Sequence, residues 1–291
     1  MKYYNQAIFG RTASSTPKYS VERIQRTASG KYPDWVYPAN DWYDVLFKNQ
    51  SVNHHAGVNI RGGSEKVQYY ASVNFNHDEG MIKTDKLNDF SCNIINNEIQ
   101  YRVNLNIDLT AGIKLVLNSS ATLDKNHGPV ESQTEAYAYA FNASPVDFAP
   151  TYPGDDTYSW PHFRFGTTPA GPNANINPYA LIQRGYKDAT RYNTINRGEY
   201  IQNLSKLVKG LELRLIASHV QTGLYQTPFV TGPYYYSLAN YDFETGKQVL
   251  QPYAGNENQG RRTLAVDVWN KKHSQSQKNR YGCYTLPSRR Y

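Results

Sequence analysis

Apolar and polar residues alternate along several long segments of this chain, and this alternation constrains the fold more than any other feature. Between residues 67 and 76, every second residue is apolar. Side chains of a strand point alternately to its two faces, whereas a helix would scatter the same residues around its surface. The clearest apolar series are Val52, Ala56, Val58 and Ile60; Val67, Tyr69, Ala71, Val73 and Phe75; Ile99, Tyr101, Val103, Leu105, Ile107 and Leu109; and Ile113, Leu115, Leu117, Ala121 and Leu123. The pattern predicts strands with one apolar and one polar face.

Two further strands are predicted over residues 190–204 and 211–220. Segments near 231–241 and 247–253 are candidates for a seventh and an eighth strand. The predicted strands are about ten residues long, whereas strands of soluble sheets most often have about five or six residues. The unusual strand length predicts a sheet that is taller than the core of a small soluble domain.

Short and long connections alternate between these strands. The short ones are 62–66, 110–112 and 205–210, and the long ones are 77–90, 124–189 and the stretch after 221. Outer-membrane barrels place short turns at one rim and long loops at the other, whereas a β-sandwich has no physical reason to do so. We therefore predict an all-β fold, namely an antiparallel transmembrane β-barrel segment that is incomplete and carries long extracellular loops.

Composition argues against three other classes of protein. Aromatic residues reach 14%, which is unlike a disordered chain. No apolar run approaches the roughly 18 residues that a membrane-spanning helix needs. The net charge of +7 comes almost entirely from residues 271–291, which hold six Lys or Arg and no Asp or Glu. Nucleic-acid binding requires a basic stripe on the folded surface, so we expect no nucleic-acid partner.

These features divide the chain into three parts. Residues 1–50 are expected to form an N-terminal segment with loops and a short helix, which begins after a capping residue at Ser20. Residues 51–270 are expected to form the partial barrel, including the long loop 124–189. Residues 271–291 are a basic low-complexity tail, which we expect to be disordered or foreign to the fold.

No constellation of residues points to catalysis or to a metal. The sequence has two cysteines, no CxxC pair, no serine elbow and no phosphate-binding loop. His54 and His55 are adjacent, and a strand turns adjacent side chains to opposite faces, where they do not readily share one ion. We therefore expect a protein that is not an enzyme and that has no metal or cofactor site.

Two aromatic clusters provide the candidate substrate-binding residues. They are Trp160, His162 and Phe163 in the long loop, and Tyr234, Tyr235 and Tyr236 at a junction between loop and strand. Aromatic rings stack on sugar rings and on peptide side chains, and binding pockets favour them. For the three tyrosines, the alternative is the aromatic girdle that anchors a barrel at the membrane interface. For Trp160, His162 and Phe163, the alternatives are the same girdle or packing within the loop, and the sequence leaves these interpretations open.

One hairpin resembles a known family. Residues 62–75, GGSEKVQYYASVNF, followed by EGMIK at 79–83, resemble a hairpin in the barrel of SusC/RagA-like TonB-dependent outer-membrane transporters. Residues 32–47 resemble the family segment that precedes this hairpin, and the resemblance covers about residues 1–230. Weaker matching fragments lie at 142–145, 177–180 and 209–211.

The resemblance implies a function as well as a fold. Family members are several times longer and begin with a signal peptide, a TonB-contacting segment and a plug domain, which we do not find in this sequence, so we expect an internal portion of the barrel. The implied location is the cell outer membrane, in contact with its lipid. The implied function is nutrient uptake, with an oligosaccharide or a peptide as substrate and with a SusD-like surface lipoprotein and the TonB complex as partners.

A second interpretation belongs to a different class, a secreted or surface β-sandwich module that binds glycans. The two interpretations differ in what covers the apolar strips. In a sandwich, Val67, Tyr69, Val73 and Phe75 would pack against a second sheet. In a barrel, the same side chains would face outward with nothing from the protein covering them.

Overall fold

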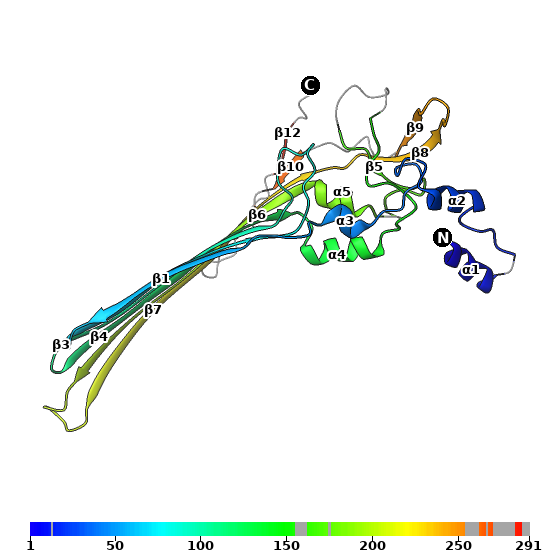
Figure 1. Cartoon of the computed structure of the whole chain (residues 1–291). Helices are drawn as coiled ribbons and strands as arrows, with labels where there is room; N and C mark the ends of the chain where they lie inside the picture. Colours follow the sequence, from blue (N-terminus) through cyan, green and yellow to red (C-terminus); the bar gives the residue numbers. More distant parts are fainter. Residues whose placement is uncertain are drawn as a thin grey trace.

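The fold is dominated by one long antiparallel sheet, seen in a computed structural model (Figure 1). The model describes residues 1–12, 14–154, 162–173, 176–253, 262–265, 267–269 and 283–286. The long strands are β1 (His54–Gly63), β2 (Val67–Glu79), β3 (Ile95–Thr110), β4 (Ile113–Pro129), β6 (Gly185–Asn203) and β7 (Glu212–Thr231). Beyond β7 lie the short strands β10 (Arg262–Ala265), β11 (Asp267–Trp269) and β12 (Cys283–Leu286), and both β10 and β11 pair with β7.

The strand register brings the alternating residues onto one face, as the sequence predicts. Val58 lies opposite Val73, which lies opposite Tyr101 on the next strand. All described pairings within this sheet are antiparallel. The prediction of a mostly antiparallel all-β fold is therefore confirmed.

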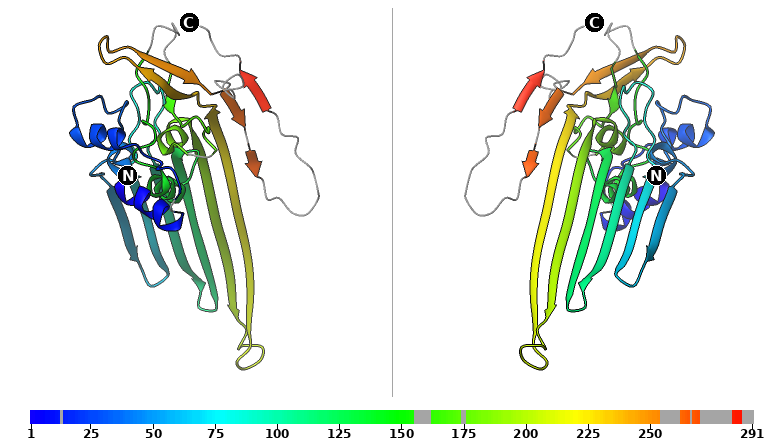
Figure 2. Two further views of the ribbon diagram at one scale, coloured as in Figure 1. Left: turned by 90° about the vertical axis from the view of Figure 1, so that its right-hand side faces the viewer. Right: turned by 90° about the vertical axis from the view of Figure 1, so that its left-hand side faces the viewer.

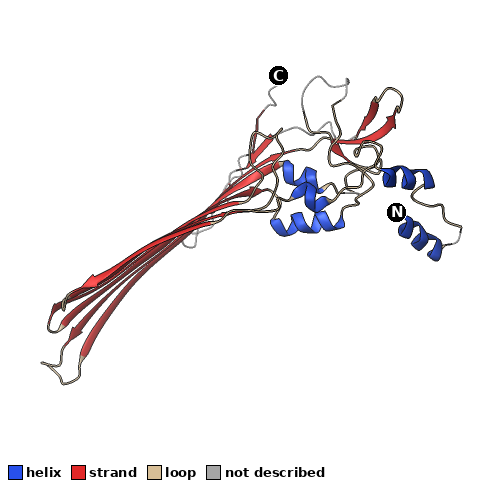
Figure 3. Cartoon of the chain, viewed as in Figure 1, coloured by secondary structure: helices blue, strands red, loops and turns tan. Residues whose placement is uncertain are grey.

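The short and long connections lie at opposite ends of the sheet. The turns between β1 and β2, β3 and β4, and β6 and β7 lie at one end, and the helices gather at the other (Figures 1 and 3). We call this second end the cap, meaning the described residues within 18–48, 80–94, 130–184 and 232–253. Figure 2 shows the same arrangement from both sides. The predicted asymmetry of the connections is confirmed.

Helix α1 (Lys2–Arg11) precedes the cap. The cap itself contains α2 (Val21–Ser29), α3 (Trp42–Leu46), α4 (Gln133–Asn142) and α5 (Pro178–Gln183). The predicted N-terminal helix is α2, which begins where Ser20 Oγ accepts a hydrogen bond from the Arg23 amide and ends at Gly30 with φ of 59°. Among the described residues, no helix is both long enough and apolar enough to cross a membrane.

The long connection differs from the loop predicted over 124–189. Strands β4 and β6 extend into it, so the connection runs over 130–184 and contains α4 and α5. Helix α4 forms because Ser132 and Glu135 make a reciprocal capping box. The predicted loop was too long at both ends because the outer parts of β4 and β6 are polar and are defined by pairing with each other.

The two candidate strands near 231–241 and 247–253 form, but outside the large sheet. They are β8 (Tyr235–Tyr241) and β9 (Gln248–Pro252), which join β5 (Phe165–Gly166) in a separate three-stranded sheet. This small sheet lies in the cap (Figure 1). Within the described residues, these two strands therefore do not extend the long sheet. Of the predicted tail 271–291, only β12 falls within the described residues, so the expectation that the tail is disordered or foreign lies mostly outside them.

The buried core lies in the cap rather than in the long sheet. Its largest cluster combines residues from α3, α4, α5 and the connections: Trp42, Leu46, Phe47, Ile82, Cys92, Ala136, Ala140, Phe148 and Ile182. On the sheet, by contrast, Tyr69, Val73 and Phe75 are 45%, 54% and 40% exposed. No described sheet packs on these side chains, so the β-sandwich interpretation is not supported.

The segment that contains α2 is tied to the β8–β9 hairpin through one cation. The guanidinium of Arg26 lies 4.6 Å from the centroid of the Phe243 ring and donates a hydrogen bond of 3.0 Å to the Tyr37 hydroxyl. The Tyr32 ring lies 5.4 Å from Phe243, and Glu22 pairs with Arg26 at 2.5 Å. Cation–π and aromatic contacts of this kind hold α2 and residues 32–37 against the β8–β9 hairpin.

Candidate functional site

The small sheet brings the two predicted aromatic clusters together. Strand β5 pairs in parallel with β8, which places Phe165 opposite Tyr235 and Gly166 opposite Tyr236. His162 and Phe163 therefore lie beside the three tyrosines, although about 70 residues separate the clusters along the chain. Trp160 lies outside the described residues. We call the five described side chains the aromatic cluster: His162, Phe163, Tyr234, Tyr235 and Tyr236.

The rings of the aromatic cluster contact one another directly. The His162 ring centroid lies 5.4 Å from that of Tyr234 and 5.7 Å from that of Tyr236. His162 Nε2 also forms a hydrogen bond of 2.8 Å with the Tyr236 hydroxyl. Phe163 stacks on Phe165 at 5.0 Å with an interplanar angle of 12°. These contacts fix the orientation of the rings relative to one another.

Burial divides the aromatic cluster into an inner and an outer part. Tyr235 and Tyr236 are buried, while His162, Phe163 and Tyr234 are half-buried. Burial raises the pKa of Tyr235 to about 12, so its phenol is neutral at physiological pH. Since Tyr235 and Tyr236 lie inside the cap, they do not form an exposed membrane girdle. The outer three rings keep accessible surface for stacking.

Two residues that the sequence did not identify as candidates, Gly166 and Asn177, shape this part of the cap. Gly166 approaches the chain closely, since a Cβ placed there would lie 1.9 Å from the Ala149 carbonyl oxygen. Asn177 is fully buried, and its side-chain amide donates hydrogen bonds of 2.9 Å to the carbonyl oxygens of Pro150 and Gly166. Its Oδ1 accepts from the first amides of α5, an N-cap arrangement that an Asn-Pro pair indicates in sequence.

A polar network holds α5 to the connection between β2 and β3. The Gln183 amide donates to the Lys83 carbonyl at 2.8 Å and accepts from Asn88 at 2.8 Å. The Tyr179 hydroxyl donates a hydrogen bond to Asp85. Burial, and to a smaller extent this hydrogen bond, raise the pKa of Tyr179. Burial also raises the pKa of the Cys92 thiol to about 12. These side chains have hydrogen-bond partners within the fold, so we assign them a structural role in the cap.

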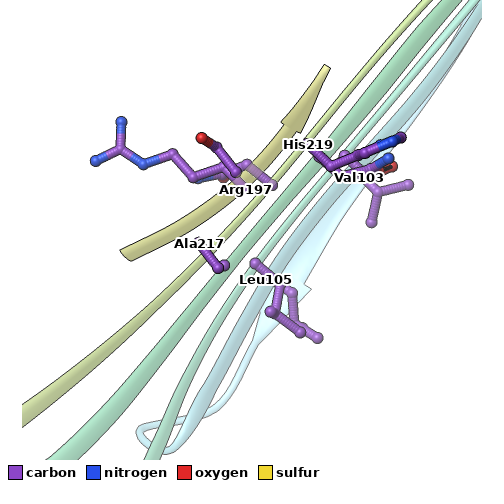
Figure 4. A pocket seen from close by; sticks show the side chains of 11 residues that line it. Val103, Leu105, Arg197, Ala217 and His219 are labelled. Atoms are coloured by element: carbon purple, nitrogen blue, oxygen red, sulfur yellow. Dashed lines mark hydrogen bonds between the residues drawn. The ribbon is translucent and has the colours of Figure 1, made fainter. Parts of the chain in front are cut away.

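The long sheet presents two faces of different character. From the row of Phe75 and Ile99 to the row of Val67 and Ile107, one face of the long strands β1–β4, β6 and β7 has no Asp, Glu, Lys or Arg. We call it the uncharged face, and it extends about 27 Å at 3.4 Å per residue. The other face of the same rows carries Arg61, Arg102, Arg197 and Glu199. Figure 4 shows Arg197 on the opposite side of the strands from Leu105.

Polar side chains interrupt the uncharged face at several positions, including Thr194 and Gln221, and one group of three shares a single row. Ser119, Asn196 and His219 lie in one row across β4, β6 and β7, and Ser119 Oγ donates a hydrogen bond of 2.7 Å to Asn196 Oδ1. They line a depression of about 530 Å³ together with Leu105 and other apolar residues (Figure 4). We call these three residues the polar notch.

The described residues contain no group of three or more His, Cys, Asp or Glu side chains placed to hold a metal ion. His55 instead contacts Asn76 at 3.0 Å, and His77 contacts Asn97 at 2.7 Å. The rings of His54 and His77 stack at 6.0 Å. These histidines therefore have partners within the sheet.

The fold defines an all-β protein with a long, mostly antiparallel sheet and a folded cap. Over 141 residues, the chain is 28% identical to the TonB-dependent receptor P26 of Formosa agariphila, a match that covers 48% of this chain. The chain spans only 13% of the length of that receptor. No protein-family model matches the chain. The likeness is thus to part of a TonB-dependent receptor, and the narrower SusC/RagA assignment stays a prediction.

Proposed function

We propose that this chain forms wall and loops of a TonB-dependent outer-membrane transporter of the SusC/RagA type. In this proposal, the uncharged face meets lipid, the opposite face lines the lumen, and the cap lies outside the cell. The transported nutrient is an oligosaccharide or a peptide. A SusD-like surface lipoprotein and the TonB complex are the partners that the family resemblance implies.

The uncharged face is the observation that carries the proposal. Val58 and Leu215, at opposite sides of this face, are 70% and 57% exposed. Exposing many such side chains to water over one continuous surface is unfavourable, because each Å² of apolar surface costs about 25 cal/mol. A height of about 27 Å fits the apolar band of about 25 Å on outer-membrane barrels. Lipid is therefore the environment that suits this surface.

The charged face supports the assignment of the lumen. Arg197 and Arg214 both pair with Glu199, at 3.4 Å and 3.3 Å, on the side opposite the uncharged face. Ion pairs of this kind are stable beside water and costly against hydrocarbon. The division of charge between the two faces therefore matches a wall between lipid and an aqueous interior.

The aromatic cluster supports substrate contact at the cap. Tyr234, His162 and Phe163 keep accessible surface, and we propose that they stack on substrate together with Trp160. Tyr235 and Tyr236 lie beneath them and hold them in position. The location of this cluster among the long connections fits a role in capturing substrate before it enters the lumen.

The proposal is tested by spin labels at adjacent positions of one strand. Val73→Cys places a nitroxide on the uncharged face, and Asn74→Cys places it on the charged face. The full 291-residue chain, with its native cysteines replaced by serine, is reconstituted into phosphatidylcholine vesicles. We expect the label at 73 to be accessible to oxygen, which partitions into lipid. The label at 74 should be accessible to a water-soluble nickel chelate.

Equal access of the nickel chelate to both labels would contradict the membrane assignment. A control label at Lys31, an exposed residue of the N-terminal segment, should be accessible to the chelate in either case. Protection of the label at 73 from both reagents, with the label at 74 still accessible to the chelate, would indicate a second protein layer over the uncharged face and would favour the sandwich. The three outcomes are distinct, so the measurement separates the alternatives.

A further inference from the structure

A second cavity lies in the cap, outside the aromatic cluster. Its volume is about 350 Å³, and Lys18, Tyr19, Arg23, Asp147 and residues 168–170 line it. The residues come from the start of the chain and from two parts of the long connection. Residues 168–170 follow β5 closely, and the amide of Thr167 donates to the Tyr236 carbonyl at 2.8 Å. The cavity is thus linked by a short stretch of backbone to the aromatic cluster.

The carboxylate of this cavity is already neutralised. Asp147 Oδ2 accepts a hydrogen bond of 2.7 Å from Lys18 Nζ, and Oδ1 accepts one of 2.9 Å from the Tyr19 hydroxyl. Burial acts to raise the pKa of Asp147, but the hydrogen bonds from Lys18 and Tyr19 hold it below its ordinary value. Asp147 is therefore ionised, and Lys18 compensates its charge.

The second cation of the cavity has no such partner. Arg23 Nη2 donates to the Val146 carbonyl at 2.6 Å, and no carboxylate among the described residues lies within ion-pair distance of Arg23. Its Nε is buried and has no hydrogen-bond partner in the described part of the chain. The neighbouring acid Glu22 pairs with Arg26 instead. The cavity therefore has a net positive charge and an unsatisfied guanidinium donor, which is a costly arrangement without a ligand.

We propose that this cavity binds the carboxylate or sulfate group of an acidic oligosaccharide. The Arg23 guanidinium is the primary donor and carries the net positive charge, because the charge of Lys18 is balanced by Asp147. Guanidinium groups recognise carboxylates and sulfates through parallel N–H donors, which a neutral sugar cannot match. The inference rests on the proposed function, because it treats the cap as the place where substrate is captured.

Sugar rather than peptide is favoured by the rings near the cavity. Lys18 Nζ lies 5.2 Å and 5.1 Å from the ring centroids of Tyr4 and Tyr19, and these two rings lie 5.7 Å apart. Tyr19 is buried, but Tyr4 is 51% exposed. Together with the outer rings of the aromatic cluster, Tyr4 offers a flat apolar surface on which sugar rings stack. An acidic oligosaccharide can therefore place its anionic group on Arg23 and neighbouring sugar rings on aromatic side chains.

Calorimetry with matched ligand pairs tests the proposal on the full chain in detergent micelles. Tetragalacturonate is compared with its methyl ester, and a κ-carrageenan tetrasaccharide is compared with its desulfated form. We expect at least one acidic ligand to bind roughly tenfold or more tightly than its neutral counterpart. The carboxylate and sulfate pairs show which anion is recognised. Raising the salt concentration should weaken the preference for the acidic ligand.

Variants locate the binding to this cavity. Arg23→Gln should lower the affinity for the acidic ligand roughly tenfold, and Arg23→Lys should restore part of it because the charge is kept while the paired donors are lost. Arg11→Gln, on α1 and outside both the cap and the sheet, removes an exposed cation of the same type and should leave the affinity unchanged. If Arg23→Gln does not fold, Arg23→Lys and the wild-type ligand pairs still decide the question.

Equal binding of acidic and neutral ligands would overturn the proposal, and so would an unchanged affinity in Arg23→Gln. Tetraglutamate binding as tightly as the acidic sugar would overturn the choice of sugar over peptide. None of these three results affects the spin-label accessibility at residues 73 and 74, on which the proposed function depends. Conversely, failure of the spin-label test alone would leave anion binding at the cap intact but remove its assignment to a transporter.

Discussion

The Nε2 atom of His162 lies 2.8 Å from the hydroxyl oxygen of Tyr236, although 74 residues separate them along the chain. Tyr236→Phe removes this hydroxyl and keeps the ring. Because such a hydrogen bond contributes about 1 kcal/mol, we expect the free energy of unfolding to fall by about that amount. Urea unfolding of the full chain in micelles measures it. Tyr3→Phe, at a residue 86% exposed, should have no effect, and a loss as large as that of Tyr236→Phe would contradict the assignment.

Asn177 supports both α5 and the backbone around β5. Asn177→Ala removes the cap of α5 and leaves the carbonyls of Pro150 and Gly166 without its donors, so we expect a loss of about 2–4 kcal/mol in the free energy of unfolding. Asn142→Ala is the matched control, since Asn142 bonds only locally to the Ala138 carbonyl at 2.7 Å and is exposed. Similar losses in the two variants, measured by urea unfolding, would show that burial of Asn177 has no special role.

Gly166 and Gly198 provide a second matched pair. A Cβ at Gly166 would lie 1.9 Å from a backbone oxygen, while at Gly198 the nearest atom is Leu117 Cδ2 at 3.6 Å. We expect Gly166→Ala to displace β5 from β8 and to lower the melting temperature strongly, since backbone atoms cannot yield as a flexible side chain does. Gly198→Ala should be close to neutral. A circular-dichroism melt of each variant checks this, and equal melting temperatures would be the contrary result.

Cys92 should be chemically protected while the cap is folded. Burial raises the pKa of its thiol to about 12 from an ordinary value of 9.0, so the folded state favours the neutral thiol. We expect iodoacetamide at pH 8 to modify Cys92 only after unfolding, measured by mass spectrometry with Cys283 replaced by serine. Rapid modification of the folded chain would contradict the burial.

The same pKa shift gives a dependence of stability on pH with a definite sign. The unfolded state binds fewer protons at Cys92 than the folded state once the pH exceeds about 9. The stabilisation is therefore complete below about pH 9 and is lost progressively as the pH rises toward about 12. Cys92→Ala should lack this component, so the difference in unfolding free energy between the two proteins should change over that pH range.

The polar notch should cost stability if the uncharged face meets lipid. His219→Leu replaces a polar side chain in the middle of this face, and we expect the free energy of unfolding in micelles to rise by about 1 kcal/mol. Ser218→Leu places the same side chain on the opposite face and should give no gain. Stabilisation by Ser218→Leu alone would reverse the assignment of the two faces. Urea titrations of both variants provide the comparison.

The long strands could be predicted because their pattern is local. Alternation from Val67 to Phe75 depends only on neighbouring residues, and the short turns follow from the interruptions of that alternation. Strand β6 was predicted to begin near residue 190, but it begins at Gly185. Its first residues have no apolar alternation, and pairing with β4 and β7 on both sides holds them in the sheet.

The cap could not be predicted to the same extent, because its order comes from contacts between distant residues. The candidate residues His162 and Tyr236 were named from their aromatic character, but the pairing of β5 with β8 that joins them has no local pattern in a two-residue strand. Asn177 and Gly166 were missed as site determinants because their importance lies in burial and close approach. Arg23 likewise could not be identified from the sequence, because the cavity in which it lies is assembled from three separate segments.

The seating of Arg26 among Tyr32, Tyr37 and Phe243 limits how the cap can move. The Arg26 guanidinium contacts rings from both the N-terminal segment and the β8–β9 hairpin, so the two segments are expected to move together. A hinge motion in the cap must therefore move α2 and the hairpin together, or break the cation–π contacts of Arg26. The same displacement would move Arg23 on α2 together with Tyr234 beside β8, so the two proposed binding positions would change together.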